Sequence, residues 1–388
     1  MHAPVLPPVP YSDPWELPFA QRLRMLSTGK RRVAYYYESA NNSTFRYRAY
    51  NMAQVINSDA GEGLSAGYFF QSDGYQLFEV AKLADVLVIC RSGYNQAVNQ
   101  LITQFRNQGK RVLFDVDDFV FDTNYTHLLI ATLGLDPHHN QVWEDWFAMV
   151  ARMGQTLRMC DGAITTNAYL AQRIEDFAQC EVAVVPNFMN AEQVEISQKV
   201  FDAKRASPFS RDDTVRLGYF SGSPSHRLDF ALVEGALETI MAEDGRVQLT
   251  LVGYIEPGPG LWRFGSRIVR QPFHDYVNLQ RLVGSVDVNL IPLQSNVFTN
   301  CKSELKYFES AAVGTVSIGS PSVKYLARVQ HAKNGYVSRA HEWTRVIRLA
   351  ISEIDRLPVL AGAAHDDAMS HFSWTQQRGT VLAAVGLR

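Results

Sequence analysis

Two lysines and a glutamate share one stripe of a predicted helix in the last third of the chain. Lys302, Lys306 and Glu309 stand at i, i+4 and i+7 in the segment KSELKYFESAAVG, and a period of about 3.6 residues puts such positions on one helix face. Ser303 is suited to cap this helix. Free N–H groups at a helix start, the helix dipole and lysine charge all favour a phosphate. The spacing predicts an anion site; the alternative is a surface helix with an ordinary Lys306–Glu309 ion pair.

A second candidate anion site is the loop in the stretch GYFSGSPSHR, which follows a predicted strand. Ser221, Gly222 and Ser223 are small, and His226 comes shortly after them. Small residues at the carboxyl end of a parallel strand let the backbone approach a phosphate closely. The stretch matches neither the GxGxxG fingerprint nor the Walker loop. It predicts a phosphate contact, and the alternative is a tight turn with a helix-capping serine.

Clustered aspartates follow another predicted strand, in the stretch FDVDDFVFD. Strand alternation puts Asp115 and Asp117 on one face and Asp118 on the other. Neighbouring carboxylates repel, which raises the pKa of one of them, so Asp117 or Asp118 could act as a catalytic base. Together the carboxylates could instead bind a divalent metal. The alternative is a helix cap and an ion pair with Arg46 or Arg48. We assign Arg46 and Asp115 to the side of the site that receives an acceptor.

Length and composition restrict the class of protein. The chain has 388 residues, of which 46% are hydrophobic and 20% charged, and predicts two or three soluble domains. A net charge of −2 gives no electrostatic reason to expect nucleic acid. The four cysteines form no CxxC and the histidines no HExxH, so we expect neither a metal nor disulfides, and a reducing, cytoplasmic compartment. Neither a secretory signal nor a run of about eighteen apolar residues occurs.

Buried strands alternate with helix-length segments, which is typical of parallel sheets covered by helices on both faces. The first half predicts strands at 33–37, 66–70, 85–90, 111–116, 163–166 and 182–185, and helices at 76–83, 95–108 and 142–158. The second half predicts strands at 216–220, 248–252, 267–271, 287–293 and 315–318, and helices at 228–241, 276–283, 304–313, 323–330 and 342–356. Polar residues 190–213, with Pro208, are the predicted linker, and a helical tail at 361–388 is expected to break near 371–374.

The N-terminal segment is proline-rich and then basic. Residues 1–20 predict an extended arm. The basic cluster that follows consists of Arg22, Arg24, Lys30, Arg31 and Arg32. Such a cluster is usually solvated surface. The alternative is peripheral contact with anionic lipid head groups at the inner face of a membrane.

The second half, from Leu217 to about Ile354, resembles the donor-binding domain of GT-B glycosyltransferases of the family 4 type. The matches, in chain order, are GYFSGSPSHRLDF, LTLVGY, DVNLIPL, KSELKYFESAAVGTVSIGS and NGYV…EW. The segment RVLFDVDDFVFD is similar to a recurring segment of polysaccharide-building relatives. The resemblance implies an α/β fold of two Rossmann-like doubly wound domains facing a cleft. Residues 1–195 would bind the acceptor, residues 210–358 the donor, and residues 359–388 would form a helix that crosses back to the first domain.

The resemblance also implies an activity. The expected reaction moves a sugar from a UDP-, GDP- or dTDP-linked donor to a saccharide or lipid-linked glycan, as in surface polysaccharide or lipopolysaccharide biosynthesis. Retention of configuration is implied, and no metal or other cofactor is expected beside the donor. Two alternatives stay open. Asp115 and Asp117 could form the metal-binding DxD of a GT-A transferase, or the chain could be a non-catalytic module that binds a sugar nucleotide or glycan.

Site roles carry over from the family position by position. The diphosphate is expected at Ser221, Gly222, Ser223, His226, Lys302 and Ser303, with Lys302 stabilising it as it departs. The ribose and base are expected at Glu309, Lys306, Phe273, His274 and Tyr254. Many members have a further glutamate eight positions before the ribose-binding one, and Cys301 stands there in this chain. The resemblance therefore implies no contact to the transferred sugar at that position.

Overall fold

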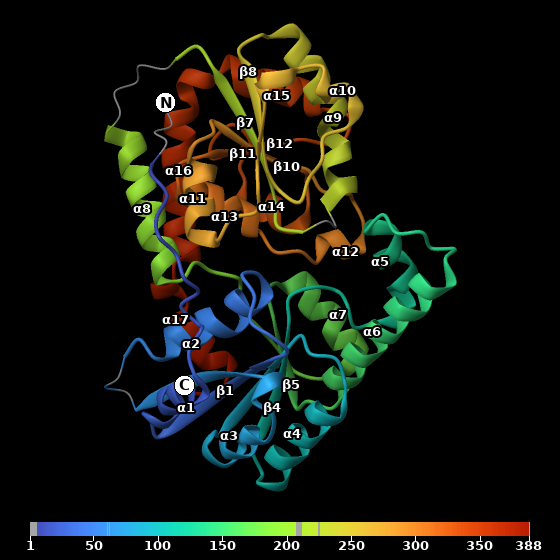
Figure 1. The fold of residues 1–388 in the computed structure, drawn as a ribbon, viewed down its shortest axis with the longest axis vertical. Coiled ribbons are helices and arrows are strands. Elements are labelled where there is room, and N and C mark those ends of the chain that lie inside the picture. The colour runs from blue at the N-terminus through green and yellow to red at the C-terminus, as the bar shows by residue number, and fades with distance from the viewer. Residues whose placement is uncertain (1–5, 60, 62, 207–211, 224–225, 388) are drawn as a thin grey trace.

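The computed structural model describes residues 6–59, 61, 63–206, 212–223 and 226–387, and it contains two six-stranded parallel sheets, one in each half of the chain (Figure 1). The first sheet has the order β2 (Leu64–Phe70), β1 (Arg31–Tyr37), β3 (Val86–Cys90), β4 (Arg111–Val116), β5 (Gly162–Thr165), β6 (Val182–Val184). The second has the order β12 (Tyr336–Val337), β11 (Val316–Gly319), β10 (Val288–Ile291), β7 (Val215–Ser221), β8 (Val247–Gly253), β9 (Ile268–Gln271). The predicted fold class is confirmed.

Each sheet is covered on both faces, which explains why its strands are apolar without interruption. In β1, Val33 and Tyr35 pack on one layer, while Ala34 and Tyr36 pack on the other. The first layer includes α2 (Asn51–Ile56), and the second includes α1 (Phe19–Ser27), α3 (Leu77–Leu83), α4 (Gln96–Asn107), α6 (Asn140–Arg158) and α7 (Ala168–Ala178). The second sheet is covered by α9 (Arg227–Glu243) and α15 (Trp343–Ser352) on one face and by α13 (Leu305–Ala312) and α14 (Val323–Arg328) on the other.

The strand order fixes where ligands can bind. In the first sheet the chain leaves β1 toward β2 and then returns to the other side of β1 as β3. In the second sheet it leaves β7 toward β8 and β9, then returns to the other side of β7 as β10. Ligands of doubly wound sheets bind outside the carboxyl ends of the strands at such reversals. The topology thus points to the β1/β3 edge and to the β7/β10 edge.

The predicted linker at 190–213 is wrong in its first part, because residues Ala191–Ala206 form helix α8. Pro208 lies outside the described residues. The helix packs against α11 (Tyr276–Gly284), where a side chain at Gly284 would collide with Val200. The buried ammonium of Lys204 donates to the carbonyl of Gly314 at 2.9 Å. Most of the surface of α8 is polar, and only one side of the helix is buried. The overall composition of the segment is therefore similar to that of a linker.

The C-terminal tail breaks where predicted and returns to the first domain. Helix α16 (Leu357–Phe372) packs on α13 and β11 of the second domain, and α17 (Trp374–Ala384) packs on α2 and β6 of the first. At the break, Met189 N donates to the carbonyl oxygen of Phe372 at 2.7 Å. The crossing therefore begins after Phe372, later than the predicted boundary at residue 359.

The described part of the N-terminal arm bridges the two domains. Val9 exchanges two hydrogen bonds of 3.0 Å with the side chain of Asn278 in α11. Trp15 is buried against Phe45 and Tyr50 of the first domain and stacks on Tyr276 of the second. Within the described residues no helix has the length and apolar character needed to cross a membrane.

Part of the basic cluster serves the fold. Arg22 is buried and forms a two-pronged ion pair with Asp73. Arg31 donates to the carbonyl oxygens of Gly386 and Leu387, just beyond the end of α17. A cation there favours the helix C-terminus. Arg24 and Lys30 are exposed.

We predict that Leu382→Ala destabilises the protein by about 2–5 kcal/mol, the usual cost of emptying a buried leucine site. Leu382 of α17 is buried in the layer that covers the first sheet. Thr380→Ala, on the exposed side of the same helix, is the matched control. The measurement is chemical denaturation followed by circular dichroism. Equal midpoints for the two variants would contradict the packing of α17 on the first domain.

Candidate functional site

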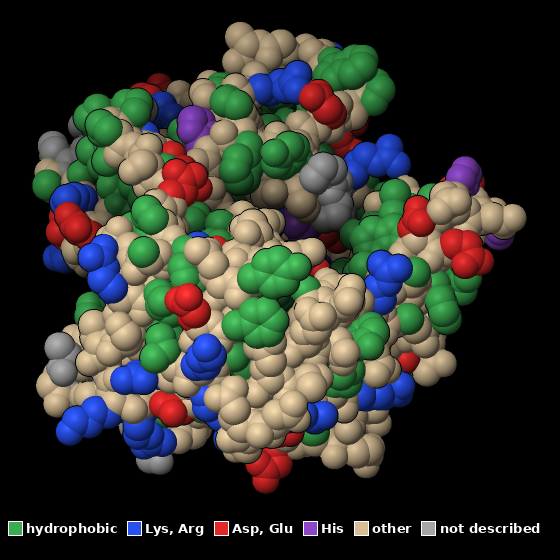
Figure 2. Space-filling model, turned by 60° about the horizontal axis from the view of Figure 1, so that its bottom comes forward, with side chains coloured by type: hydrophobic (Ala, Val, Ile, Leu, Met, Phe, Trp, Pro, Cys, Tyr) green, Lys and Arg blue, Asp and Glu red, His purple; other side chains and the backbone are tan. Residues whose placement is uncertain are grey.

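The carboxyl ends of the two sheets face each other across a cleft. Lys302, beyond β10, lies 3.8 Å from Asp118, beyond β4. Figure 2 shows a hollow between the two domains on one side of the molecule. One wall of the cleft is closed by α5 (Thr126–Thr132), because Gln294 and Asn296 of the second domain donate to Thr132. Side chains from both domains therefore meet in one site.

The lysine-bearing segment lies at the cleft but begins differently from the prediction. A short helix, α12 (Val297–Asn300), comes first, and the N-cap of α13 is Glu304 in place of Ser303. The hydroxyl of Ser303 instead accepts a hydrogen bond of 3.1 Å from Asn187. Gly314 ends the segment with a left-handed φ of 66°, as expected. Lys302 thus lies just before α13, and Lys306 lies in its first turn.

Lys306 is the most informative side chain of the site. Its ammonium is buried, and within the described residues it has no hydrogen-bond acceptor. It lies 4.8 Å from the centre of the Tyr219 ring, a cation–π contact. Burial lowers the pKa of Lys306 to about 8, with Lys302 acting in the same direction and Asp229 against it. A buried ammonium without an acceptor is costly, so this position is prepared for an anion.

His226 and Asp229 form a pair beside the two lysines. Nδ1 of His226 lies 3.0 Å from a carboxylate oxygen of Asp229. Burial, followed by the charges of Lys306 and Lys302, lowers the pKa of His226 to about 4, so the ring is neutral near pH 7. Since a carboxylate only accepts, Nδ1 carries the proton and donates it to Asp229. The other oxygen of Asp229 accepts from the amide of Gln294 at 3.0 Å.

The glycine loop after β7 borders the same space. The hydroxyl of Ser221 donates to the carbonyl oxygen of Ser223 at 2.9 Å, which closes the turn. A side chain added at Gly222 would meet no atom of the described residues within 4 Å. The predicted motif continues through Pro224 and Ser225, which lie outside the described residues.

Residues predicted to hold the base gather at the next strand ends. Tyr254 follows β8 and Phe273 follows β9, and their ring centres are 5.5 Å apart. They are 52% and 44% exposed, enough for a flat group to stack on them. Nε2 of the neighbouring His274 is buried without a hydrogen-bond partner among the described residues.

Glu309 lies where the two domains touch. One oxygen accepts from the hydroxyl of Tyr47 at 2.6 Å and from Gln193 at 3.2 Å. The guanidinium of Arg46 lies 3.5 Å from the same oxygen, and Arg46 is itself buried between the rings of Tyr47 and Tyr276. The structure thus joins Glu309 and Arg46, which we had assigned separately to ribose and acceptor, in one interdomain network.

The expectation that Asp117 and Asp118 face opposite sides is wrong. Strand β4 ends at Val116, so strand alternation no longer governs these two residues. Both carboxylates lie 3.1 Å from the guanidinium of Arg91. Burial alone would raise the pKa of Asp118, but the charges of Lys302 and Arg91 outweigh it and hold that pKa below its usual value.

Asp115 is committed to the first domain. Both of its oxygens accept from Arg48, at 2.7 and 2.9 Å, and the two side chains are buried. Arg48 also donates to the carbonyl of Val185 at 2.8 Å. Because its oxygens already hold a guanidinium, Asp115 does not fit a DxD metal site with Asp117. Within the described part of the chain, no cluster of three or more His, Cys, Asp or Glu side chains is arranged to hold a metal.

Two residues of the site were missed from the sequence. Arg91 follows the buried strand β3 and has a φ of 35°, a strained backbone for a residue other than glycine. A charged residue directly after a run of apolar strand residues lies at the carboxyl end of a buried strand, and this was the sequence signal for a site residue. Asp229 stands three residues after His226 at a helix start, and this spacing was the sequence signal for a side-chain pair.

Two facing doubly wound domains with a returning C-terminal helix define the GT-B fold of glycosyltransferases. HepE from Anabaena, solved with UDP and glucose, is 12% identical, with 91% of this chain and 99% of that chain covered and a TM-score of 0.59. A glycosyltransferase from Rickettsia africae is 12% identical, with 91% and 97% covered and a TM-score of 0.60. Sucrose-phosphate synthase from Thermosynechococcus elongatus is 12% identical, with 91% and 97% covered and a TM-score of 0.58.

These structural likenesses establish the shared fold. No protein-family model matches the chain, and a search of curated proteins finds no relative. The predicted GT-B fold is therefore confirmed by structure, while the family 4 assignment stays a prediction.

We predict that a diphosphate ligand binds more weakly as the pH rises above about 8, where free Lys306 loses its proton. A bound diphosphate raises the pKa of Lys306. At a pH between the pKa of free and of ligand-bound Lys306, binding takes up a proton, so the affinity falls by up to about tenfold per pH unit. Lys306→Arg stays charged throughout. Titration calorimetry from pH 7 to 10 should give a sloping profile for the wild type and a flatter one for the variant. Identical profiles would contradict the role given to Lys306.

We predict that Arg48→Met destabilises the protein by about 3–5 kcal/mol, because it leaves the carboxylate of Asp115 buried without its partner. Arg106→Met is the matched control, since it removes a solvent-exposed pair with Asp161 and should cost at most about 1 kcal/mol. Denaturant unfolding measures both. Comparable losses would show that Asp115 does not depend on Arg48.

Proposed function

We propose that this chain is a glycosyltransferase that moves a sugar from a nucleotide-diphosphate sugar to a saccharide or lipid-linked glycan. The observation that carries the proposal is the buried Lys306 ammonium, which has no hydrogen-bond acceptor among the described residues. A diphosphate in the cleft would supply both the acceptor oxygens and the opposite charge. The GT-B fold supports the same reading, since HepE with this fold was solved with UDP-glucose.

In the proposed reaction the protein stabilises the charge that develops on the departing diphosphate. Lys302 and Lys306 supply positive charge, and the start of α13 and the amides near Gly222 supply N–H groups. In this proposal Ser221, Ser223, His226 and Ser303 contact the diphosphate, as the family resemblance implies. Stacking on Tyr254 and Phe273 would hold the base of a UDP-, GDP- or dTDP-linked donor, and Glu309 would reach the ribose after the donor binds.

We further propose retention of configuration without a metal. An inverting reaction uses a carboxylate base, and the charges of Lys302 and Arg91, which lower the pKa of Asp118, make it a weaker base. This supports front-face attack by the acceptor hydroxyl. The two lysines supply the positive charge that a metal ion provides in other transferases.

We place the reaction in the cytoplasm, in the building of a surface polysaccharide such as lipopolysaccharide. The four unpaired cysteines, Cys90, Cys160, Cys180 and Cys301, support a reducing compartment. The exposed Arg24 and Lys30 support peripheral contact with anionic head groups at the inner face of the membrane.

The proposal is tested by nucleotide release from a panel of UDP-, GDP- and dTDP-sugars, with and without saccharide acceptors. Acceptor-stimulated release that survives EDTA is the expected result. Release lost in EDTA and restored by manganese would indicate a metal-dependent transferase instead. Donor binding without turnover on any acceptor would indicate a binding module.

We predict that Lys302→Ala lowers turnover by about two orders of magnitude, the usual effect of removing one stabiliser of developing charge. Lys333→Ala, an exposed lysine of the same domain, is the matched control and should keep the wild-type rate. Initial rates of nucleotide release, with circular dichroism to verify folding, measure the effect. A folded Lys302→Ala protein with wild-type rates would rule out this role.

A further inference from the structure

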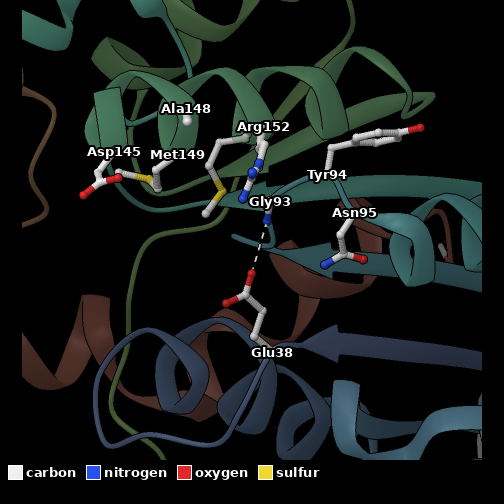
Figure 3. A pocket seen from close by; sticks show the side chains of 9 residues that line it. Glu38, Gly93, Tyr94, Asn95, Asp145, Ala148, Met149 and Arg152 are labelled. Atoms are coloured by element: carbon white, nitrogen blue, oxygen red, sulfur yellow. Dashed lines mark hydrogen bonds between the residues drawn. The ribbon is translucent and has the colours of Figure 1, made fainter. Parts of the chain in front are cut away.

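A groove in the first domain lies apart from the donor residues and was not predicted from the sequence. It has a volume of ≈ 300 Å³, at the lower end of the range of about 300–1,000 Å³ common for small-molecule sites. Its walls are the residue after β1, the loop after β3 and the inner side of α6 (Figure 3). This is the β1/β3 edge, where the topology of the first sheet places a ligand.

The groove presents opposite charges from its two sides. Figure 3 shows Arg152 reaching from α6 toward Gly93, and Glu38 reaching toward Gly93 from the other side. One oxygen of Glu38 accepts from Gly93 N at 3.3 Å, which leaves the rest of the carboxylate open. In the described part of the chain, neither Glu38 nor Arg152 has an ion-pair partner within 4.0 Å. A carboxylate and a guanidinium thus face the same groove.

The loop between them is fixed in place. Tyr94 N donates to the carbonyl oxygen of Arg152 at 3.0 Å, which ties the loop to α6. A side chain at Gly93 would lie 3.3 Å from Cβ of Arg152, so glycine allows this close approach. Asn95 caps α4 through its carbonyl oxygen and keeps its amide group for other partners. The groove is therefore preformed.

The lining favours a neutral, polyhydroxylated molecule. A hydroxyl both donates and accepts, so neighbouring hydroxyls can serve Glu38 and Arg152 together. Asp145 adds a second carboxylate, and the two acidic groups outnumber the one arginine, which disfavours an anion. Ala148, Met149 and Met153 give the groove an apolar side. Alternating polar edges and apolar C–H faces are the chemistry of a sugar ring.

The groove is connected to the proposed reaction centre by a short stretch of chain. Arg91 stands two residues before Gly93, a span of at most about 7 Å. Arg91 lies 3.1 Å from Asp118, which in turn lies 3.8 Å from Lys302. A molecule held between Glu38 and Arg152 could therefore present a hydroxyl toward the donor side of the cleft.

We propose that this groove binds the acceptor as a neutral saccharide unit, with Glu38 and Arg152 as the residues that determine its specificity. The inference rests on the proposed function and refines it. It moves the acceptor contact away from Arg46 and Asp115, whose side chains are buried in other interactions.

The test is saturation-transfer NMR on the full chain saturated with UDP, with a mixture of methyl glycosides of glucose, mannose, galactose and rhamnose as the probe. At least one glycoside should bind the wild type. Glu38→Gln and Arg152→Met should each weaken that binding at least tenfold. Glu144→Gln, an exposed residue of α6 outside the groove, should leave it unchanged.

UDP affinity is measured on every variant and separates the two proposals. Unchanged UDP binding with lost glycoside binding in Glu38→Gln and Arg152→Met supports the groove. Equal glycoside binding by those variants and the wild type would overturn it, as would UDP binding without binding of any glycoside. Failure of the wild type to bind UDP would instead overturn the proposed function and, with it, this inference.

Discussion

The buried positive charge of Lys306 is the constraint on which the account of this cleft depends. Removing an ammonium group from water costs free energy. A carboxylate or carbonyl oxygens that accept its hydrogen bonds usually offset this cost. Lys204 illustrates the satisfied case, because it is buried but donates to Gly314 and Thr315. Among the described residues Lys306 has no hydrogen-bond acceptor, and it lies against the face of the Tyr219 ring. That difference makes Lys204 part of the fold and Lys306 part of a site.

Around this charge, the two domains are held in contact by polar networks that cross between them. Tyr47 and Arg46 from the first domain meet Glu309 on the helix that also carries Lys306. Arg91 meets Asp118, which faces Lys302. The residues proposed to bind the donor are therefore linked to both domains. Donor binding, which brings two negative phosphates among these pairs, is expected to change how the domains contact each other.

The two parallel sheets and their carboxyl edges could be predicted from the sequence, because both follow from local pattern. Uninterrupted Val, Ile and Leu strands such as Val86–Cys90 are buried on both faces and read clearly. The break near Ser373 and the helix end at Gly314 also follow from local residue types. From these features the fold class, the carboxyl edges of both sheets and the place of the lysines could be predicted.

The features that the sequence did not predict depend on contacts between residues far apart in the chain. Helix α8 was predicted to be a linker because its segment is polar overall. Its contribution to the fold comes from Val200 and other buried residues that pack on α11. The hydrogen bond between Tyr47 and Glu309 was not predicted, because the two residues lie 262 positions apart in sequence. Asp118 joined Asp117 at Arg91 because the strand ends at Val116, two residues before Asp118, so alternation does not apply to the pair. No local pattern encodes such partners.

The central claim is tested most directly by a crystal structure of the protein with UDP. The account predicts a phosphate oxygen within about 3.2 Å of the Lys306 ammonium, a normal hydrogen-bond distance, with Lys302 on the same diphosphate. A structure in which UDP is bound elsewhere, and Lys306 still has no acceptor, would contradict it.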